Sequence, residues 1–217
     1  GSKGFIGSQL CKLLIKKKYN IFGIGSCRKF NPEEIPSSIK KFIEGNINSI
    51  NLQKLYSYSG NPDIIFHLAG SNSVGQSIIN PFLDYQKTVL STSNLLEFVR
   101  KNNLNSKIVF ASSAAVYGNN YNRSIKEEDE CRPFSPYGFN KFIAEKLIES
   151  YSTNFNINSI VIRFFSIYGV NAKKQLIWDI CQKLNINNSS IDLYGNGNEI
   201  RDWIYIQDAV DLLIKAS

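Results

Sequence analysis

The sequence has a single histidine, His67, and no Cys-x-x-Cys pair. Zinc sites are usually built from clustered His and Cys side chains, so we expect no metal site of this kind. No apolar run approaches the roughly 20 residues of a membrane-spanning helix, and no signal-peptide pattern opens the chain. We therefore expect a cytoplasmic protein without a membrane partner, whose cysteines are free thiols: Cys11, Cys27, Cys131 and Cys181.

A strong cluster of positive charge is also missing, although the formal net charge is +7. Such a balance can attract nucleic acid, an anionic membrane or an anionic small substrate. The basic residues are scattered, and no zinc-finger spacing, basic heptad or aromatic RNA-binding motif accompanies them. A solvated, Lys-rich surface is therefore favoured, and no nucleic-acid partner is expected. The length of 217 residues suggests one large domain, or one domain with part of another.

Glycine gathers at the start of the chain, where Gly1, Gly4 and Gly7 lead into a segment of helical periodicity. A glycine turn before a helix suits a dinucleotide phosphate, because backbone N–H groups can approach it closely. Residues 21–24 follow as a short buried strand, while the strand expected before the glycines is absent. We therefore expect a chain truncated at its start.

The residue that would select the cofactor is expected at the end of this strand. Dinucleotide folds usually place an acid there for the ribose 2′-OH of NAD. Here Gly25 is followed by Ser-Cys-Arg28-Lys, and a basic residue suits the 2′-phosphate of NADP. The choice between NAD and NADP remains open, with NADP favoured by this basic residue. The alternative is an exposed Arg28 that contacts no ligand.

Apolar strands predicted at 63–70, 108–118 and 159–165 alternate with helices at 81–101 and from 136 onward. This alternation predicts an α/β fold with a doubly wound parallel sheet. From about residue 170 the pattern loosens into a helix at 175–184, a strand at 191–194 and a final helix from 208. We expect a dinucleotide-binding domain over 1–169, and the start of a partly interleaved substrate-binding region over 170–217.

One helix carries a Tyr-x-x-x-Lys pair, Tyr137 and Lys141, after a Ser-Pro helix start. The two side chains stand one turn apart on the same face. A neighbouring cation favours the phenolate, so the spacing predicts a Tyr137 pKa below its usual value of about 10. The apolar arc of the same helix places Glu145 and Glu149 on the opposite, outer side.

Two further features accompany the pair. The strand at 108–118 delivers serine hydroxyls at its C-terminal end, where ligands of open α/β sheets bind. His67 ends an apolar strand, which favours a structural histidine over a catalytic one.

Six motifs in order now identify a resemblance: Gly-x-x-Gly-Phe-Ile-Gly, His-Leu-Ala-Gly, Ser-Ser-Ala-Ala-Val-Tyr-Gly, Ser-Pro-Tyr-Gly-Phe-Asn-Lys, Arg-Phe-Phe-Ser-Ile-Tyr-Gly and Arg-Asp-Trp-Ile-Tyr-Ile. The chain resembles the extended short-chain dehydrogenase/reductases over nearly its whole length. It is most similar to the NAD-dependent epimerase/dehydratase family, UDP-glucose 4-epimerases included. The resemblance implies a Rossmann-like fold, bound NAD or NADP, a nucleotide-diphosphate sugar as substrate, and a homodimer.

The resemblance also implies roles for residues at matching positions. Tyr137 matches the catalytic base, Lys141 the lysine that binds the nicotinamide ribose, and Ser113 the hydroxyl that contacts the reacting sugar. The cofactor-binding positions are Gly1, Gly4, Phe5, Ile6, Gly7, Arg28, Asn46, Ile47, Leu68, Ala69, Gly70, Thr88, Tyr137, Lys141 and Phe164. The substrate-binding positions are Ser113, Ser166, Gln175, Leu176, Tyr194 and Arg201, with Tyr194 on the base and Arg201 on the diphosphate.

Some positions depart from the family pattern. Ala114 and Ala115 stand where 4,6-dehydratases carry an Asp-Glu pair, so dehydration is not expected. Other departures affect ligand contacts. Thr88 and Ser166 stand where family members usually have Asn, Asn46 stands where they have Asp, and Asn72 stands where UDP-glucose 4-epimerases have Lys. The expected activity is epimerisation at the sugar C4. The alternatives are an NADPH-dependent reductase of a 4-keto-6-deoxy sugar and a non-catalytic nucleotide-binding homologue.

Overall fold

The computed structural model describes residues 1–25, 39–186, 190–193, 195, 197 and 200–217. Within them the strands form three hydrogen-bonded sets, and every pairing is parallel. The first set is β1 (Phe22–Gly25) with β2 (Lys41–Glu44), and the second is β3 (Ile64–His67), β4 (Lys107–Ser113) and β5 (Ser159–Phe164) in that order. The third joins β6 (Ser166–Tyr168) to β7 (Trp203–Tyr205). The predicted parallel α/β fold is confirmed.

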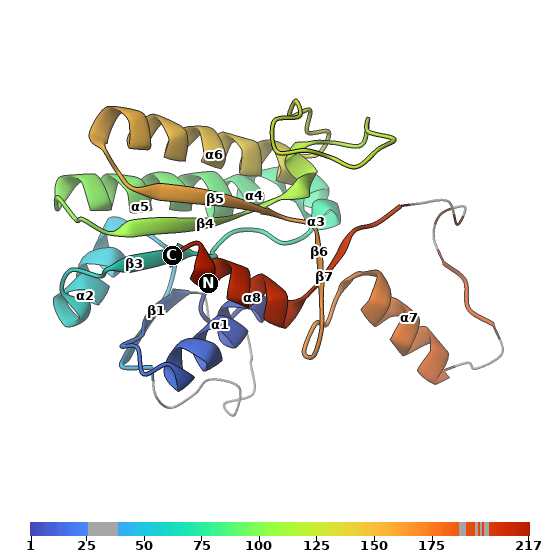
Figure 1. Cartoon of the computed structure of the whole chain (residues 1–217), viewed down its shortest axis with the longest axis horizontal. Helices are drawn as coiled ribbons and strands as arrows, with labels where there is room; N and C mark the ends of the chain where they lie inside the picture. The colour runs from blue at the N-terminus through green and yellow to red at the C-terminus, as the bar shows by residue number, and fades with distance from the viewer. Residues whose placement is uncertain (26–38, 187–189, 194, 196, 198–199) are drawn as a thin grey trace.

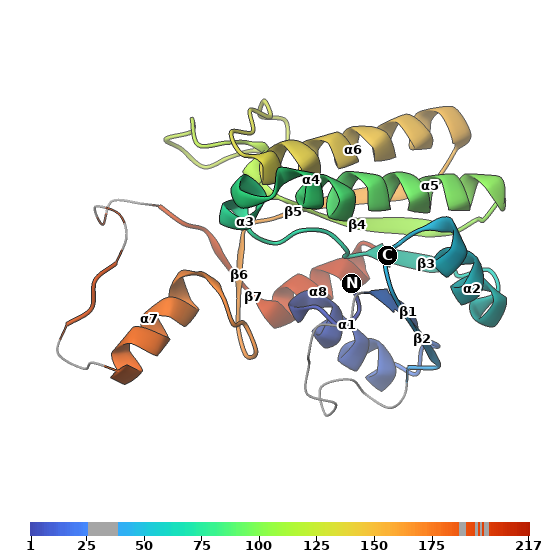
Figure 2. The same cartoon turned by 180° about the vertical axis from the view of Figure 1, so that it is seen from behind.

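Helices cover both faces of the β3-β4-β5 sheet (Figures 1 and 2). On one face lie α4 (Pro81–Tyr85), α5 (Ser91–Lys101) and α6 (Pro136–Phe155), and on the other lie α1 (Phe5–Lys16) and α8 (Ile206–Lys215). The remaining helices are α2 (Ser49–Ser59), α3 (Val74–Ile79) and α7 (Gln175–Ile186), of which α7 extends away from the sheet.

The central strand β4 explains why the core has two halves. Ile108 and Phe110 face a cluster formed with α5 and α6, whereas Val109 and Ala111 face a cluster formed with α1 and α8. Side chains alternate along a strand, so a strand covered on both faces is apolar throughout. This is why residues 108–111 read as an uninterrupted apolar run.

The segment 81–101 was expected to be one helix but contains three parts. Between α4 and α5 lies the π-helical segment η2 (Gln86–Leu90). Such segments insert an extra residue per turn and occur often at functional sites. Thr88 and Val89 of η2 are buried, so the widened turn directs Thr88 toward the sheet.

Several other elements differ from the expectations. The pattern did not predict β2, α2 or α3. The strand expected at 191–194 is wrong for residues 191–193, which have no regular structure. Tyr194 lies outside the described residues. The described cysteines Cys11, Cys131 and Cys181 are free, and no helix of the described part is long and apolar enough to cross a membrane.

Candidate active site

The glycine turn at the start of the chain packs tightly against the end of β3. A Cβ added to Gly1 would lie 2.6 Å from the Leu68 carbonyl carbon, and one added to Gly7 would lie 2.1 Å from the Gly1 oxygen. No larger residue fits at either position, so both glycines are required by close backbone approach. Leu68 and Ala69, predicted to line the cofactor, are thereby held beside the turn.

Helix α1 begins at Phe5 directly after this turn, with Gly4 as its N-cap. Because Gly4 has no side chain, the first N–H groups of α1, at Phe5, Ile6 and Gly7, are not capped by it. Uncapped N–H groups and the positive end of the helix dipole suit a bound pyrophosphate. The residues present therefore fit a dinucleotide cofactor at this turn.

Lys141 reaches through the core to the end of β3 and β4. Its Nζ donates a hydrogen bond to the Ala111 carbonyl at 2.8 Å, and only 5% of the residue is exposed. A Cβ on Gly70 would lie 3.2 Å from Nζ and 3.5 Å from Thr88 Oγ1. Gly70, Thr88 and Lys141, all predicted cofactor positions, thus converge. Burial lowers the pKa of Lys141 to about 8.

Tyr137 lies one turn before Lys141, on the first turn of α6. Ser135 caps this helix by accepting a hydrogen bond from the Gly138 N–H at 3.2 Å, as the Ser-Pro start predicts. The side chain of Ser113, at the end of β4, is close enough to the Tyr137 phenol to lower its pKa. The structure thus brings Ser113, Tyr137 and Lys141 together at the carboxyl end of the sheet.

The predicted lowering of the Tyr137 pKa is not found. Burial raises the pKa of Tyr137, the Ser113 side chain opposes that rise, and the negative charge of Asp84 adds to it. Lys141 is not among the causes of the shift, since its ammonium is directed to the Ala111 carbonyl. The two residues do lie one turn apart on α6, but the Lys141 ammonium is directed to the Ala111 carbonyl and not to the Tyr137 phenol.

His67 is a buried structural residue. Its Nε2 lies 2.9 Å from Thr92 Oγ1, and its ring packs 5.3 Å from that of Phe110. Burial lowers its pKa to about 3, with the positive charge of Lys141 contributing. His67 is therefore neutral across the working range of pH, as the favoured structural interpretation requires.

The remaining predicted cofactor positions lie on neighbouring strand ends. Asn46 and Ile47 follow β2, where the Ile47 carbonyl accepts a hydrogen bond from Asn94 at 3.0 Å. Phe164 ends β5 and pairs in register with Ser113. Arg28 lies outside the described residues.

Apart from Ser113 on β4 and the undescribed Tyr194, the predicted substrate positions lie on β6, at the start of α7 and two residues before β7. Ser166 begins β6, and its N–H donates to the Asp202 carbonyl at 3.1 Å, next to the exposed Arg201. Gln175 and Leu176 open α7. A cavity of about 120 Å³ lies between these elements and includes Gln175, Trp178 and Trp203 in its lining. A larger depression of about 880 Å³ between α2 and α5 contains none of the predicted site residues.

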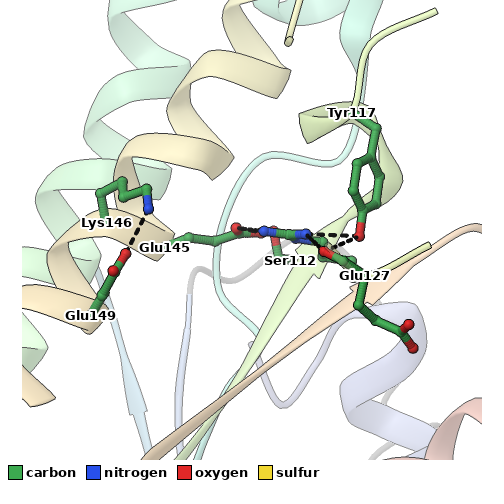
Figure 3. Close-up of polar contacts among 7 residues, drawn as sticks. Ser112, Tyr117, Glu127, Glu145, Lys146 and Glu149 are labelled. Carbon is green, nitrogen blue, oxygen red and sulfur yellow. Dashed lines mark hydrogen bonds and ion pairs between the residues drawn. The ribbon is translucent and has the colours of Figure 1, made fainter. Parts of the chain in front are cut away.

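A polar network beside the site was not predicted. Arg163 on β5 binds Glu145 of α6 at 2.8 Å and donates to the Tyr117 hydroxyl at 2.7 Å and the Glu127 carbonyl at 3.2 Å. Ser112 donates to the same Glu145 carboxylate (Figure 3). The network ties the segment after β4 to α6, and its member Ser112 directly precedes Ser113.

The fold and these residues define the class of an α/β nucleotide-binding protein of the dehydrogenase/reductase type. Residues 1–217 match the NAD dependent epimerase/dehydratase family. The chain belongs to this family.

Individual relatives are consistent with this membership. A Bacillus subtilis protein named as an uncharacterized UDP-glucose epimerase is 33% identical over 221 residues, covering 97% of this chain and 68% of its own length. The Thermotoga maritima UDP-glucose 4-epimerase structure with UDP-glucose superposes with a TM-score of 0.88 at 25% identity, over 99% of this chain and 70% of that one. The Brucella ovis UDP-glucose 4-epimerase structure with NAD superposes with a TM-score of 0.88 at 25% identity, over 100% of this chain and 70% of that one.

Proposed function

We propose that this protein is a nucleotide-sugar epimerase that inverts the configuration at the sugar C4. The observation that carries the proposal is the convergence of Ser113, Tyr137 and Lys141 at the carboxyl end of β4, beside the glycine turn. Ligands of open α/β sheets bind at this end. Family membership and the named epimerase relatives support the same reaction class.

Each of the three residues has a chemical task. Tyr137, as phenolate, takes the proton of the C4 hydroxyl, and Ser113 fixes that hydroxyl by a hydrogen bond. Such a placed base supplies about 10²–10⁴-fold of the rate. When bound, the nicotinamide of the cofactor would supply the hydride acceptor and donor for the C4 carbon. Between the two hydride transfers the 4-keto sugar rotates, so that the hydride returns to its other face. Tyr137 then gives the proton back to the oxygen.

The cofactor is NAD or NADP. Gly1, Gly4 and Gly7 with the first turn of α1 would hold its pyrophosphate, and Gly70, Thr88 and Lys141 would lie at its nicotinamide half. Lys141 must be an ammonium to bind the ribose and to favour the phenolate of Tyr137. The Brucella ovis relative contains NAD, which supports NAD. Thermal-shift titration of the full-length protein with each dinucleotide distinguishes the two.

The substrate is proposed to be a nucleoside diphosphate sugar. Ser166, Gln175, Leu176 and Arg201 would contact its nucleotide, with Arg201 paired to the diphosphate. Ala114 and Ala115 follow Ser113 on the short helix η3 (Ala114–Val116). Neither side chain can transfer a proton, so water elimination is not part of the proposed reaction.

The test is an assay of the full-length protein with UDP-glucose and UDP-galactose, wild type against Tyr137→Phe. We expect interconversion without net consumption of cofactor, and a loss of about 10²–10⁴-fold in kcat for the variant. Stoichiometric consumption of NADPH with a 4-keto sugar would show that the protein is a reductase and not an epimerase. Equal activity of Tyr137→Phe would refute the mechanism.

We further propose that the protein is a homodimer that associates through α4 and α6. Apolar side chains exposed on the α3–α4–η2 segment and on neighbouring α6 support this proposal: Ile78, Ile79, Phe82, Leu83, Tyr85, Leu90, Phe139 and Ile143. An exposed apolar surface of this kind is typical of a protein interface.

A further inference from the structure

Asp84 is a buried carboxylate close to the Tyr137–Lys141 pair. It lies on α4, two residues before η2, and is only 2% exposed. Its Oδ2 accepts a hydrogen bond from Asn140 Nδ2 at 2.6 Å, whereas its Oδ1 has no hydrogen-bond partner among the described residues. Burying a carboxylate with so little compensation is costly. Its deep burial and its unpartnered oxygen point to a role beyond the contact with Asn140.

The charged and titratable neighbours of Asp84 come from several elements. Helix α6 contributes Tyr137 and Lys141, on both of which the charge of Asp84 acts, while Glu145 of α6 and the neutral His67 of β3 lie around Lys141. Lys87 of η2 and the exposed Tyr85 of α4 belong to the same segment, while α3 has no titratable side chain. Within the described part of the chain Asp84 forms no ion pair, so its charge acts on these neighbours from a distance.

The field of Asp84 acts on both members of the pair in the same direction. Its negative charge raises the pKa of Lys141, which burial lowers, and also raises the pKa of Tyr137. Glu145 acts on Lys141 in the same way but more weakly. Asp84 therefore favours the ammonium of Lys141 and disfavours the phenolate of Tyr137.

The partner of Asp84 lies within the same turn of α6. Asn140 directly precedes Lys141 and stands three residues after Tyr137, and it is itself 8% exposed. Its hydrogen bond to Asp84 therefore fixes the carboxylate relative to both side chains. The π-helical turn that follows Asp84 places Thr88 at Gly70 and Lys141, so one segment supplies both contacts.

We propose that Asp84 is a positioning residue, whose carboxylate, fixed by Asn140, sets the charge balance of the Tyr137–Lys141 pair. It touches neither substrate nor cofactor and acts only through these two side chains. The inference rests on the proposed function for its catalytic consequence. Its electrostatic part can be measured without catalysis.

The catalytic test is the pH profile of kcat/KM for wild type and Asp84→Asn, in the full-length protein with its cofactor. Activity requires Tyr137 unprotonated and Lys141 protonated. Removing the negative charge lowers both pKa values, so both limbs of the bell-shaped profile move to lower pH, whichever residue governs each limb. On the alkaline side of the profile, the ratio of kcat/KM to its own maximum should be at least about threefold lower in Asp84→Asn than in wild type.

Two further variants keep the test specific. Glu149→Gln removes one negative charge from the exposed side of α6, where Glu149 pairs with Lys146 at 2.7 Å, and should leave the limbs in place. The exchange Asp84→Asn/Asn140→Asp restores one carboxylate and one amide, and should return the limbs toward the wild-type pH. Unmoved limbs in Asp84→Asn, or an equal shift in Glu149→Gln, would overturn the proposal.

A measurement without turnover separates this inference from the proposed function. The ¹³Cε signal of Lys141, assigned by its loss in Lys141→Met, reports the protonation of the side chain. We expect its titration midpoint at lower pH in Asp84→Asn than in wild type, and an unchanged midpoint would overturn the inference. Wild-type protein that epimerises no nucleotide sugar but shows this shift would refute the proposed function alone.

Discussion

The Arg163 guanidinium on β5 lies 2.8 Å from the Glu145 carboxylate on α6. Hydrogen bonds extend this ion pair to the Ser112 hydroxyl, the Tyr117 hydroxyl and the Glu127 carbonyl (Figure 3). The Glu145 side chain is 7% exposed, so the pair is shielded from solvent on the carboxylate side. One guanidinium thus connects the sheet, α6 and the segment after β4.

The first prediction concerns the stability supplied by this pair. Arg163→Met leaves the Glu145 carboxylate buried without its cation, which should lower the free energy of unfolding by about 3 kcal/mol in urea titrations. The double variant Arg163→Met/Glu145→Met removes both charges and should recover part of that loss.

The matched control is Lys146→Met, which breaks the exposed Lys146–Glu149 pair on the same helix. Exposed pairs contribute at most about 1 kcal/mol. If Arg163→Met cost no more than Lys146→Met, the network would not support α6.

The second prediction uses the contact between α6 and the end of β4. A Cβ on Gly138 would lie 2.6 Å from the Ala115 carbonyl oxygen and 3.1 Å from Pro133 Cβ. Gly138→Ala must push α6 away from η3, at a cost of about 1–3 kcal/mol. Because Tyr137 is the adjacent residue, kcat should fall as well, and the assay with UDP-galactose measures this.

Gly75→Ala is the control for that substitution. Gly75 lies on α3, and nothing lies within 4 Å of an added Cβ. Alanine at an open helical position should raise stability by about 0.5–1 kcal/mol. Equal effects at both glycines would show that helix propensity, not the contact with Ala115, is being measured.

The main elements could be predicted because their physical causes are local. Strand β4 is covered on both faces, so its residues are uniformly apolar. The start of α6 depends on the Ser135 cap and on proline in the first turn, and both signals lie in adjacent residues. The close approach of Gly1 and Gly7 likewise follows from glycine spacing alone.

Other features depend on partners distant in sequence. Glu145 was expected on the outer side of α6 but is buried, because Arg163 pairs with it from β5, 18 residues later. The Tyr137 pKa depends on burial and on Asp84, a residue of another helix. Strand β2, with only two apolar residues, owes its existence to its pairing with β1. No local pattern carries such information.

The third prediction concerns Lys141 and pH. Its pKa is lowered to about 8 in the folded protein from an ordinary value of 10.5. Between these values the unfolded chain binds more protons than the folded one, so the contribution of Lys141 to stability rises with pH. Below pH 8 the cost of burying the ammonium is present in full.

Lys141→Met removes this dependence. The free energy of unfolding of wild type minus that of the variant should increase by about 2 kcal/mol from pH 7 to pH 10, measured in urea without added cofactor. Lys146→Met, at an exposed position of the same helix, should show no such increase. A flat difference for Lys141→Met would mean that the buried side chain keeps its ordinary pKa.

The fourth prediction tests the proposed dimer. Phe82 of α4 and Phe139 of α6 are 67% and 51% exposed, and the Phe82 ring stacks with that of Tyr85 at 6.4 Å. Burial of such side chains against a second copy would contribute about 25 cal/mol per Å² of apolar surface. A lysine at either position would instead bury an unpaired charge in the interface. Phe82→Lys and Phe139→Lys should therefore sediment as monomers at concentrations where wild type is a dimer.

Ile50→Lys provides the control, because Ile50 lies on α2, away from α4 and α6, and is 76% exposed. Dissociation by Ile50→Lys, or a dimer retained in both phenylalanine variants, would place the contact elsewhere on the molecule.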